Sequence, residues 1–153
     1  MNILFICMGN ICRSPLLEGW AGHRRPDAQV AYTVDSAGTG GWHAGDPPDA
    51  RAVAAARRRG VDISAQRARQ LQANDFQRFD LLLCADRDNL AAVQTLAPSD
   101  ARGRIALALD WCGVSRGGEV PDPYYGQERD FDHVCQLASE AAEGLLRRLA
   151  SQA

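Results

Sequence analysis

The 153-residue sequence contains no lysine: all 17 basic residues are arginines, and 19 acidic residues bring the net charge to −2. Nucleic-acid binding needs a basic surface, so this balance predicts no nucleic-acid partner. A long hydrophobic run is also missing, and the short apolar start, residues 2–7, has no basic residue before it. We therefore expect no signal peptide, no membrane insertion and a cytoplasmic location, with export by another route left open.

Cysteine occurs five times, but its spacing excludes two common uses. The positions are Cys7, Cys12, Cys84, Cys112 and Cys135. The number is odd and no pair of CxxC motifs occurs, which argues against a disulfide framework and against a structural zinc site. In a reducing compartment, a cysteine can instead be kept for its reactivity.

Short apolar runs alternate with longer amphipathic stretches along the chain. The strand candidates are residues 2–7, 30–36, 80–85 and 104–108, and the helix candidates are residues 15–24, 47–59, 86–96 and 128–150. This alternation predicts an α/β fold in one domain, residues 1–153. We expect a three-layer sandwich in which a four-stranded parallel sheet has helices on both faces, as in flavodoxin-like, doubly wound proteins.

Several residues predict where these elements end. Ser14 is the expected cap of the first helix, and Asp46 and Gly60 are the expected cap and stop of the second. Residues 109–127 contain four glycines and two prolines, which indicates a long functional loop. Ligands of such folds bind at the carboxyl ends of the strands, so Cys7 and this loop should lie on the same edge of the sheet.

The strongest motif spans residues 7–15, where five residues separate Cys7 from Arg13. It begins where the first strand stops, and Ser14-Pro15 starts a helix whose free amides face the loop. Gly9 and Asn10 tolerate the left-handed backbone of a tight turn. A loop of inward N–H groups closed by a helix N-terminus binds a dianion, so we predict a phosphate-binding loop. Its expected members beside Cys7 and Arg13 are Met8, Gly9, Asn10, Ile11, Cys12 and Ser14.

Each polar residue of this loop has an expected task. Cys7 is the candidate nucleophile, a thiolate near neutral pH because the amides and Arg13 favour the anion. Arg13 can hold two phosphate oxygens, and Ser14 can donate a hydrogen bond to the sulfur when it leaves. With these groups supplying the charge, we expect no metal and no cofactor. The alternative, a buried strand-end cysteine and a solvated arginine, fits the strand–loop–helix context poorly.

Residues 7–15 resemble the signature of the low-molecular-weight protein tyrosine phosphatases, and the resemblance extends over nearly the whole chain. Further matching segments are 35–39, Trp42, 68–70, 84–86 with 89–90, and 121–125. The resemblance implies hydrolysis of phosphotyrosine through a phosphocysteine on Cys7. It also implies that Asp122 is the general acid and later the general base. Asn10 and Ser36 match the residues that brace the loop.

The expected pocket walls also come from the resemblance. Ile11, Trp42, Tyr124 and Tyr125 match residues at the family's pocket entrance, and apolar and aromatic walls suit a phosphorylated ring. Related arginine phosphatases carry threonine in place of Ile11, so isoleucine favours a phosphotyrosine-containing protein substrate. Trp42 could instead be a core tryptophan. We expect the enzyme to act as a monomer.

The remaining expectations concern cysteines and one departure from the pattern. Cys12 matches a family cysteine and is the expected redox partner that captures oxidised Cys7. Gln66 stands where many relatives carry a histidine, so the bracing of the loop could differ here. Two alternatives stay open: an arsenate reductase that uses Cys84 as a relay, and a catalytically inactive phosphate reader. The first lacks a further cysteine near Cys84, and the second requires the loss of groups that are present.

Overall fold

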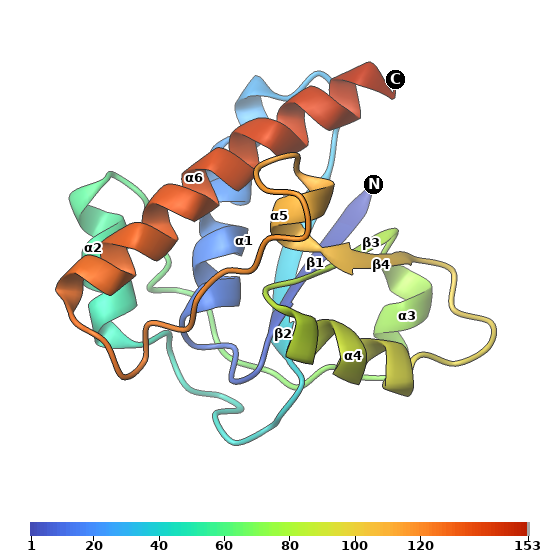
Figure 1. Ribbon diagram of the computed structural model, residues 1–153, viewed down its shortest axis with the longest axis horizontal. Helices are drawn as coiled ribbons and strands as arrows, with labels where there is room; N and C mark the ends of the chain where they lie inside the picture. The colour runs from blue at the N-terminus through green and yellow to red at the C-terminus, as the bar shows by residue number, and fades with distance from the viewer. Residues whose placement is uncertain (153) are drawn as a thin grey trace.

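Four parallel strands form the centre of the protein in a computed structural model that describes residues 1–152. They are β1 (Asn2–Cys7), β2 (Thr33–Gly38), β3 (Leu81–Cys84) and β4 (Arg104–Leu107), in the spatial order β2-β1-β3-β4. Every neighbouring pair is parallel. Both faces of the sheet are covered by helices, which confirms the predicted single-domain α/β fold (Figure 1).

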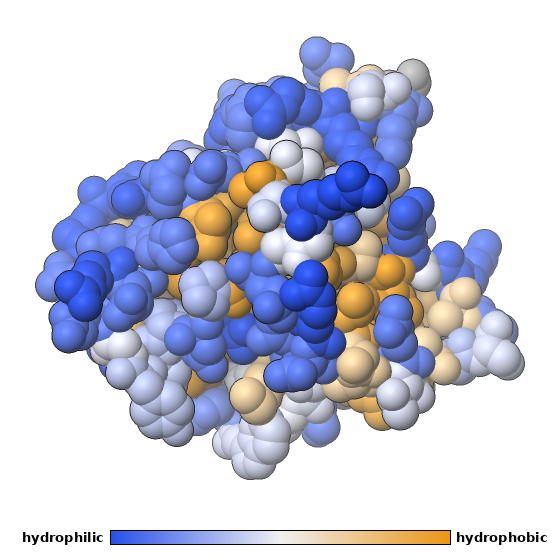
Figure 2. Space-filling model, viewed as in Figure 1, coloured by the Kyte–Doolittle hydropathy of each residue, from blue (hydrophilic) through white to orange (hydrophobic). Residues whose placement is uncertain are grey.

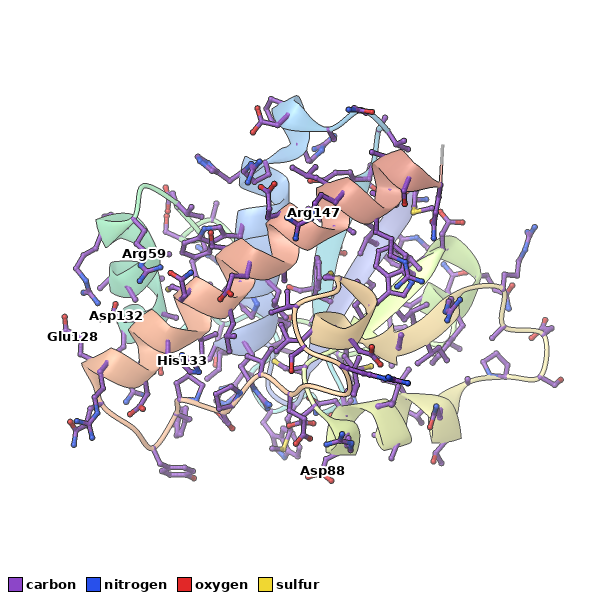
Figure 3. All side chains as sticks on the ribbon, turned by 45° about the horizontal axis from the view of Figure 1, so that its top comes forward. Arg59, Asp88, Glu128, Asp132, His133 and Arg147 are labelled. Atoms are coloured by element: carbon purple, nitrogen blue, oxygen red, sulfur yellow. The ribbon has the colours of Figure 1, made fainter. Side chains whose placement is uncertain are left out.

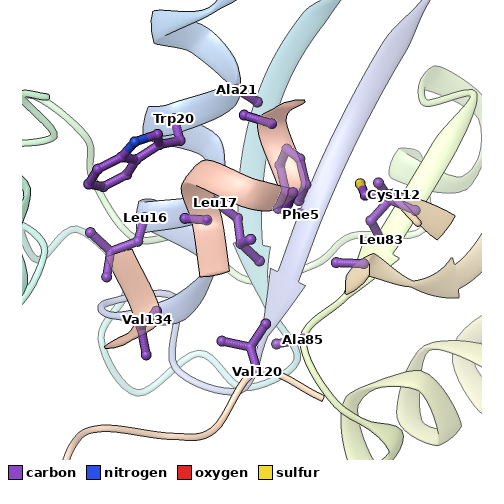
Figure 4. Close-up of a cluster of buried hydrophobic side chains, with 14 of the residues drawn as sticks. Phe5, Leu16, Leu17, Trp20, Ala21, Leu83, Ala85, Cys112, Val120 and Val134 are labelled. Carbon is purple, nitrogen blue, oxygen red and sulfur yellow. The ribbon is translucent and has the colours of Figure 1, made fainter. Parts of the chain in front are cut away.

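The helices form two layers around this sheet. They are α1 (Arg13–His23), α2 (Ala50–Arg58), α3 (Asp75–Arg78), α4 (Arg87–Leu96), α5 (Ala108–Trp111) and α6 (Glu128–Ser151), with a 3₁₀ turn at Arg25–Asp27. On one face, Phe5 of β1 packs with Leu16 and Leu17 of α1 and with Val134 of α6 (Figure 4). On the other face, residues 4 and 6 of β1 pack with residues of α3 and α4. Burial on both faces explains why β1 and β3 are almost entirely apolar.

Two helix starts differ from the sequence prediction. Helix α1 begins at Arg13 rather than at Pro15, and the Ser14 side chain caps nothing because it is turned toward Cys7. Proline is tolerated there because the first four N–H groups of a helix have no partner within it. Helix α2 begins at Ala50, after two prolines, and its cap is Asp49 instead of Asp46. Helical backbone angles are unfavourable for a residue that precedes a proline. Pro47 precedes Pro48, so the helix does not begin at residue 47.

Other boundaries hold to within a few residues, with two exceptions. Strand β2 begins at Thr33, three residues later than predicted. The preceding chain instead crosses toward the sheet, with Tyr32 buried and its hydroxyl donating to the Ala21 carbonyl at 2.6 Å. Helix α5 occupies the start of the predicted loop 109–127. Gly60 ends α2 as expected, with φ at 84°.

Two arginines at the end of α2 connect this helix to α6. Arg58, the last residue of α2, lies 2.9 Å from Asp132 and 3.2 Å from Glu128, and the next residue, Arg59, donates to Gln136 at 3.0 Å. Figure 3 shows Arg59 at the end of α2 beside the first turns of α6, where Glu128 and Asp132 lie. The face seen in Figure 2 is largely hydrophilic, with hydrophobic residues in small patches. Within residues 1–152, no helix has the length and apolarity needed to cross a membrane.

Candidate active site

Cys7 ends β1, and the loop after it turns directly into α1 at the carboxyl edge of the sheet. The segment that leads to α6 reaches the same edge, where the Val120 N–H donates to the Ala85 carbonyl at 2.8 Å. In this way the sheet brings the loop after β1 and the loop after α5 together. Parallel strands place their carboxyl ends on one edge, as the sequence analysis expected.

The Cys7 sulfur lies in a shell of hydrogen-bond donors. It is 3.3 Å from the Asn10 backbone N–H and 3.0 Å from Ser14 Oγ. The loop N–H groups of residues 9 and 11–13 have no acceptor among the described residues. Only 3% of Cys7 is exposed, so these donors act in a site with little water. Such unpaired amides around a thiol suit a bound dianion.

Asn10 takes the left-handed backbone that was predicted for it, whereas Gly9 does not. Asn10 has φ at 58° and is the only described non-glycine residue with positive φ. Gly9 is not in that region, so the expectation of a left-handed Gly9 is wrong. A Cβ at Gly9 would lie 3.2 Å from the His43 ring, which is a tight contact.

The buried side chain of Asn10 connects the loop to β2. Its amide nitrogen donates to Ser14 Oγ at 2.8 Å and to Ser36 Oγ at 2.9 Å, and its amide oxygen accepts from the Arg69 N–H at 2.9 Å. Ser36 Oγ donates to the carboxyl group of Glu18 at 2.7 Å. The bracing pair expected from the sequence is therefore in contact, and Glu18 and Arg69 are additional members that sequence reasoning missed. Glu18 lies one turn after Ser14 on α1, and Arg69 lies in the matched segment 68–70, so these positions were the available signals.

Arg13 is fixed by three groups from other parts of the chain. Its guanidinium donates to Asp86 Oδ2 at 2.6 Å and to the Val120 carbonyl at 3.2 Å, and it lies 3.8 Å from Asp122. Burial disfavours its charge, but Cys7, Asp86 and Asp122 outweigh that cost and raise the pKa of Arg13. The arginine is thus held as a cation beside Cys7.

Asp86 was not assigned a role from the sequence. It lies two residues after the end of β3 and caps α4. Its Oδ1 accepts from the Asn89 N–H at 2.8 Å, while its Oδ2 accepts from Arg13. Its position was the available signal, because Asp86 follows the predicted strand 80–85 and lies in the matched segment 84–86. Because it uses one oxygen for the helix and one for Arg13, it orients the guanidinium rigidly.

Asp122 lies at the mouth of the site on the loop between α5 and α6. Its side chain is 44% exposed, and one oxygen accepts from the Tyr124 N–H at 3.1 Å while the other points toward Arg13. This placement leaves the carboxyl group in contact with water and on the same cavity as Cys7. A group so placed can exchange protons with a ligand in the cavity.

A cavity of about 250 Å³ opens above Cys7. Apart from Asn10, Ser14 and the Ser36 behind them, every site residue expected from the sequence lines it: Cys7, Met8, Gly9, Ile11, Cys12, Arg13, Trp42, Asp122, Tyr124 and Tyr125. Trp42 is 73% exposed, so it belongs to the rim and not to the core. His43 also lines the cavity and lies 3.3 Å from Asp46.

The other cysteines fall into two groups. Cys12 lines the cavity and is buried, and burial with the nearby Asp49 raises its thiol pKa. Cys84 packs on the sheet face opposite Cys7, and burial raises its pKa to about 12. That separation disfavours a thiol relay from Cys7 to Cys84. Cys112 and Cys135 are buried in the hydrophobic core.

Gln66 braces α1 rather than the loop. Its side-chain nitrogen donates to the Pro15 carbonyl at 3.0 Å, and its side-chain oxygen is buried without a partner among the described residues. The Asn10–Ser36 contact is formed without it. In the part of the chain that the structure describes, no group of three or more potential ligands could hold a metal ion.

A parallel-sheet fold with a cysteine and an arginine in one amide-lined loop is the architecture of a phosphate-ester hydrolase. The family model described as low molecular weight phosphotyrosine protein phosphatase matches residues 2–153. The chain belongs to this family, whose members are protein-tyrosine phosphatases.

Relatives match along nearly their whole length. The low molecular weight protein-tyrosine-phosphatase YfkJ of Bacillus subtilis is 35% identical, covering 95% of this chain and 94% of the relative. The enzyme of Streptomyces coelicolor is 37% identical over 99% of this chain and 94% of its own. A crystal structure of the protein tyrosine phosphatase of Entamoeba histolytica superimposes with a TM-score of 0.91 at 33% identity, covering 99% and 98% of the two chains.

Proposed function

We propose that this protein hydrolyses phosphotyrosine in protein substrates through a phosphocysteine on Cys7. The observation that carries the proposal is the environment of the Cys7 sulfur, which has two hydrogen-bond donors and an arginine at its side. Four loop residues with unpaired N–H groups complete a site for a phosphate dianion. A nucleophile and an anion site that coincide are what phosphoryl transfer requires.

The residues divide the reaction between them. Cys7 attacks phosphorus in line with the ester oxygen, while Arg13 and the loop amides stabilise the equatorial oxygens. Asp122 protonates the leaving phenolate and then takes a proton from the water that hydrolyses the phosphocysteine. Ser14 donates to the sulfur as it departs, which lowers the cost of expelling a thiolate. Met8, Gly9, Ile11 and Cys12 complete the loop.

The walls of the cavity support an aromatic substrate. Tyr124 and Tyr125 pack edge to face with centroids 5.0 Å apart, and Trp42 and Ile11 lie on the same cavity. A phosphorylated ring can stack between such groups. A crystal structure of Wzb from Vibrio vulnificus, in complex with benzylphosphonate, has a TM-score of 0.84 and 33% identity to this chain, with 96% and 97% of the two chains covered. An aryl phosphate, which has an aromatic ring and a phosphorus dianion as benzylphosphonate does, is the chemical class that we propose for this cavity.

We further propose reversible redox control by Cys12 in a reducing, cytoplasmic setting, with the enzyme acting as a monomer. Peroxide oxidises the Cys7 thiolate to a sulfenic acid, and the Cys12 thiol then displaces water to form a disulfide. Both cysteines line one cavity, which supports their approach. A dithiol would restore the nucleophile.

The test compares Cys7→Ser with Cys135→Ser, the same chemical change at a buried α6 residue outside the site. Cys7→Ser should bind phosphate but lose turnover of a phosphotyrosine peptide, because no base near residue 7 can activate serine. Cys135→Ser should keep turnover. Acid quenching of the wild type should trap phosphate on Cys7, and a phosphoarginine peptide should be a much poorer substrate. Normal turnover by Cys7→Ser would refute the mechanism, and preference for phosphoarginine would refute the substrate.

A further inference from the structure

Glu18 is a charged residue that the mechanism above does not use, although it ends a chain of hydrogen bonds that starts at the nucleophile. The chain runs from Cys7 to Ser14 at 3.0 Å, to Asn10 at 2.8 Å, to Ser36 at 2.9 Å and to Glu18 at 2.7 Å. Ser14 and Glu18 lie one turn apart on α1, so one helix holds both ends of the polar chain.

The orientation of the central amide fixes the direction of every bond in the chain. Asn10 Oδ1 accepts from the Arg69 backbone N–H, which can only donate, so the Asn10 NH₂ group must face the two serines. Its two hydrogens go to Ser14 Oγ and Ser36 Oγ. Each serine oxygen therefore accepts from Asn10 and directs its own hydrogen outward. Ser14 donates to the Cys7 sulfur, and Ser36 donates to Glu18.

An ionised Glu18 holds this chain more strongly than a protonated one. A protonated carboxyl group can still accept from Ser36 through Oε1 when its hydrogen is on Oε2, but that bond joins two neutral groups. A hydrogen bond to a carboxylate is shorter and roughly twice as strong. The order of the network thus depends on the charge at its far end.

We propose that Glu18 is a positioning residue whose carboxylate, through Ser36 and Asn10, holds the Ser14 hydroxyl on the Cys7 sulfur. The proposal rests on the phosphocysteine mechanism, since Ser14 acts when the sulfur leaves phosphorus. Glu18 touches neither the sulfur nor the cavity, so it influences breakdown of the phosphocysteine rather than binding of phosphate.

The surroundings of Glu18 place its titration near neutral pH. Burial raises the Glu18 pKa to about 7, the hydrogen bond from Ser36 opposes this rise, Asp35 of β2 adds to it and Arg69 opposes it. Asp35 and Arg69 are themselves paired at 3.1 Å, which limits the influence of either charge. The brace should therefore be fully formed above pH 7 and weaken below it.

The experiment compares wild type, Glu18→Gln, Ser36→Ala and the double variant, with Glu143→Gln as the matched control. Glu143 is an exposed carboxylate of α6 that pairs at 2.7 Å with Arg24, the residue that follows α1. The reaction is followed with p-nitrophenyl phosphate in a rapid-mixing instrument between pH 5.5 and 8. The burst reports formation of the phosphocysteine, the steady phase reports its breakdown, and inhibition by inorganic phosphate reports the anion site.

We expect Glu18→Gln to slow breakdown by about 3- to 10-fold at pH 8, the size of one weakened hydrogen bond. At pH 5.5 the difference from wild type should nearly vanish, because the wild-type residue is then also uncharged, and the ratio should change around pH 7. Phosphate inhibition should stay the same. Ser36→Ala should show the same pH-dependent loss, and adding Glu18→Gln to it should change nothing more. Glu143→Gln should match wild type throughout.

Two results would overturn the proposal: a wild-type to Glu18→Gln ratio that does not vary with pH, or losses in the two single variants that multiply in the double variant. A purely structural role would lower the unfolding temperature of Glu18→Gln and leave the ratio constant. If Glu18→Gln does not fold, Ser36→Ala alone decides through its own pH-dependent ratio. Failure of the phosphocysteine mechanism is separate, because no phosphate would then be trapped on Cys7 in any variant.

Discussion

Replacing Glu18 by glutamine should remove a component of the pH dependence of stability that the wild-type protein carries. Burial raises the Glu18 pKa from 4.5 to about 7 in the folded protein. Between these pH values the folded state binds more protons than the unfolded state, so stability falls as pH rises through this window. Well above pH 7, Glu18 is ionised in both the folded and the unfolded protein, and the loss of stability no longer changes with pH.

The size of this loss follows from the shift. The difference of 7 − 4.5, or about 2.5 units, corresponds to roughly 3 kcal/mol at 1.36 kcal/mol per unit. Most of it, about 2.5 kcal/mol, develops between pH 5 and pH 8. For a domain of this size that equals a change in unfolding temperature of roughly 5–10 °C.

Urea unfolding at pH 5, 6, 7 and 8, followed by tryptophan fluorescence, measures the effect. The free energy of unfolding of Glu18→Gln should gain about 2.5 kcal/mol relative to wild type from the lowest to the highest pH. Glu143→Gln, an exposed change on α6, should run parallel to wild type. Parallel curves for Glu18→Gln and wild type would show that Glu18 is not buried as an acid, and the reasoning would be wrong.

Three further changes test other parts of the site. Asp122→Ala should slow aryl phosphates by roughly 10²–10⁴, with a smaller defect for more acidic leaving groups; an equal defect for all leaving groups would make Asp122 structural. Asp86→Asn should keep the α4 cap through its one acceptor oxygen but weaken phosphate inhibition and kcat/KM by about 10- to 100-fold, because an amide NH₂ group replaces the charged partner of Arg13. Unchanged inhibition would mean that Asp86 does not orient Arg13. Cys12→Ser should turn over normally but recover less activity than wild type when a dithiol follows peroxide; equal recovery would exclude protection by Cys12.

Features formed by neighbouring residues could be predicted from the sequence. The alternation of apolar and amphipathic segments predicted the parallel sheet and its two helical layers. A strand that is buried on both faces is a short continuous run of apolar residues, which can be recognised in the sequence. The loop from Cys7 to Arg13 is contiguous, so its anion site follows from local backbone rules. Helix starts at Ser14 and Asp46 were misjudged because a cap depends on where the side chain turns, and Ser14 turns to the sulfur instead.

Contacts between distant residues were decided by the tertiary structure alone. Asp86 meets Arg13 because β3 lies next to β1, so the chain after β3 reaches the start of α1. Glu18 meets Ser36 because β2 pairs with the other side of β1 beneath α1. Sequence patterns report the period and the ends of single elements, whereas the strand order and the packing of helices on the sheet set which of those elements touch. Cys7 and Arg13 therefore lie in one short stretch of sequence, whereas Asp86 and Glu18 reach their partners only in the folded protein.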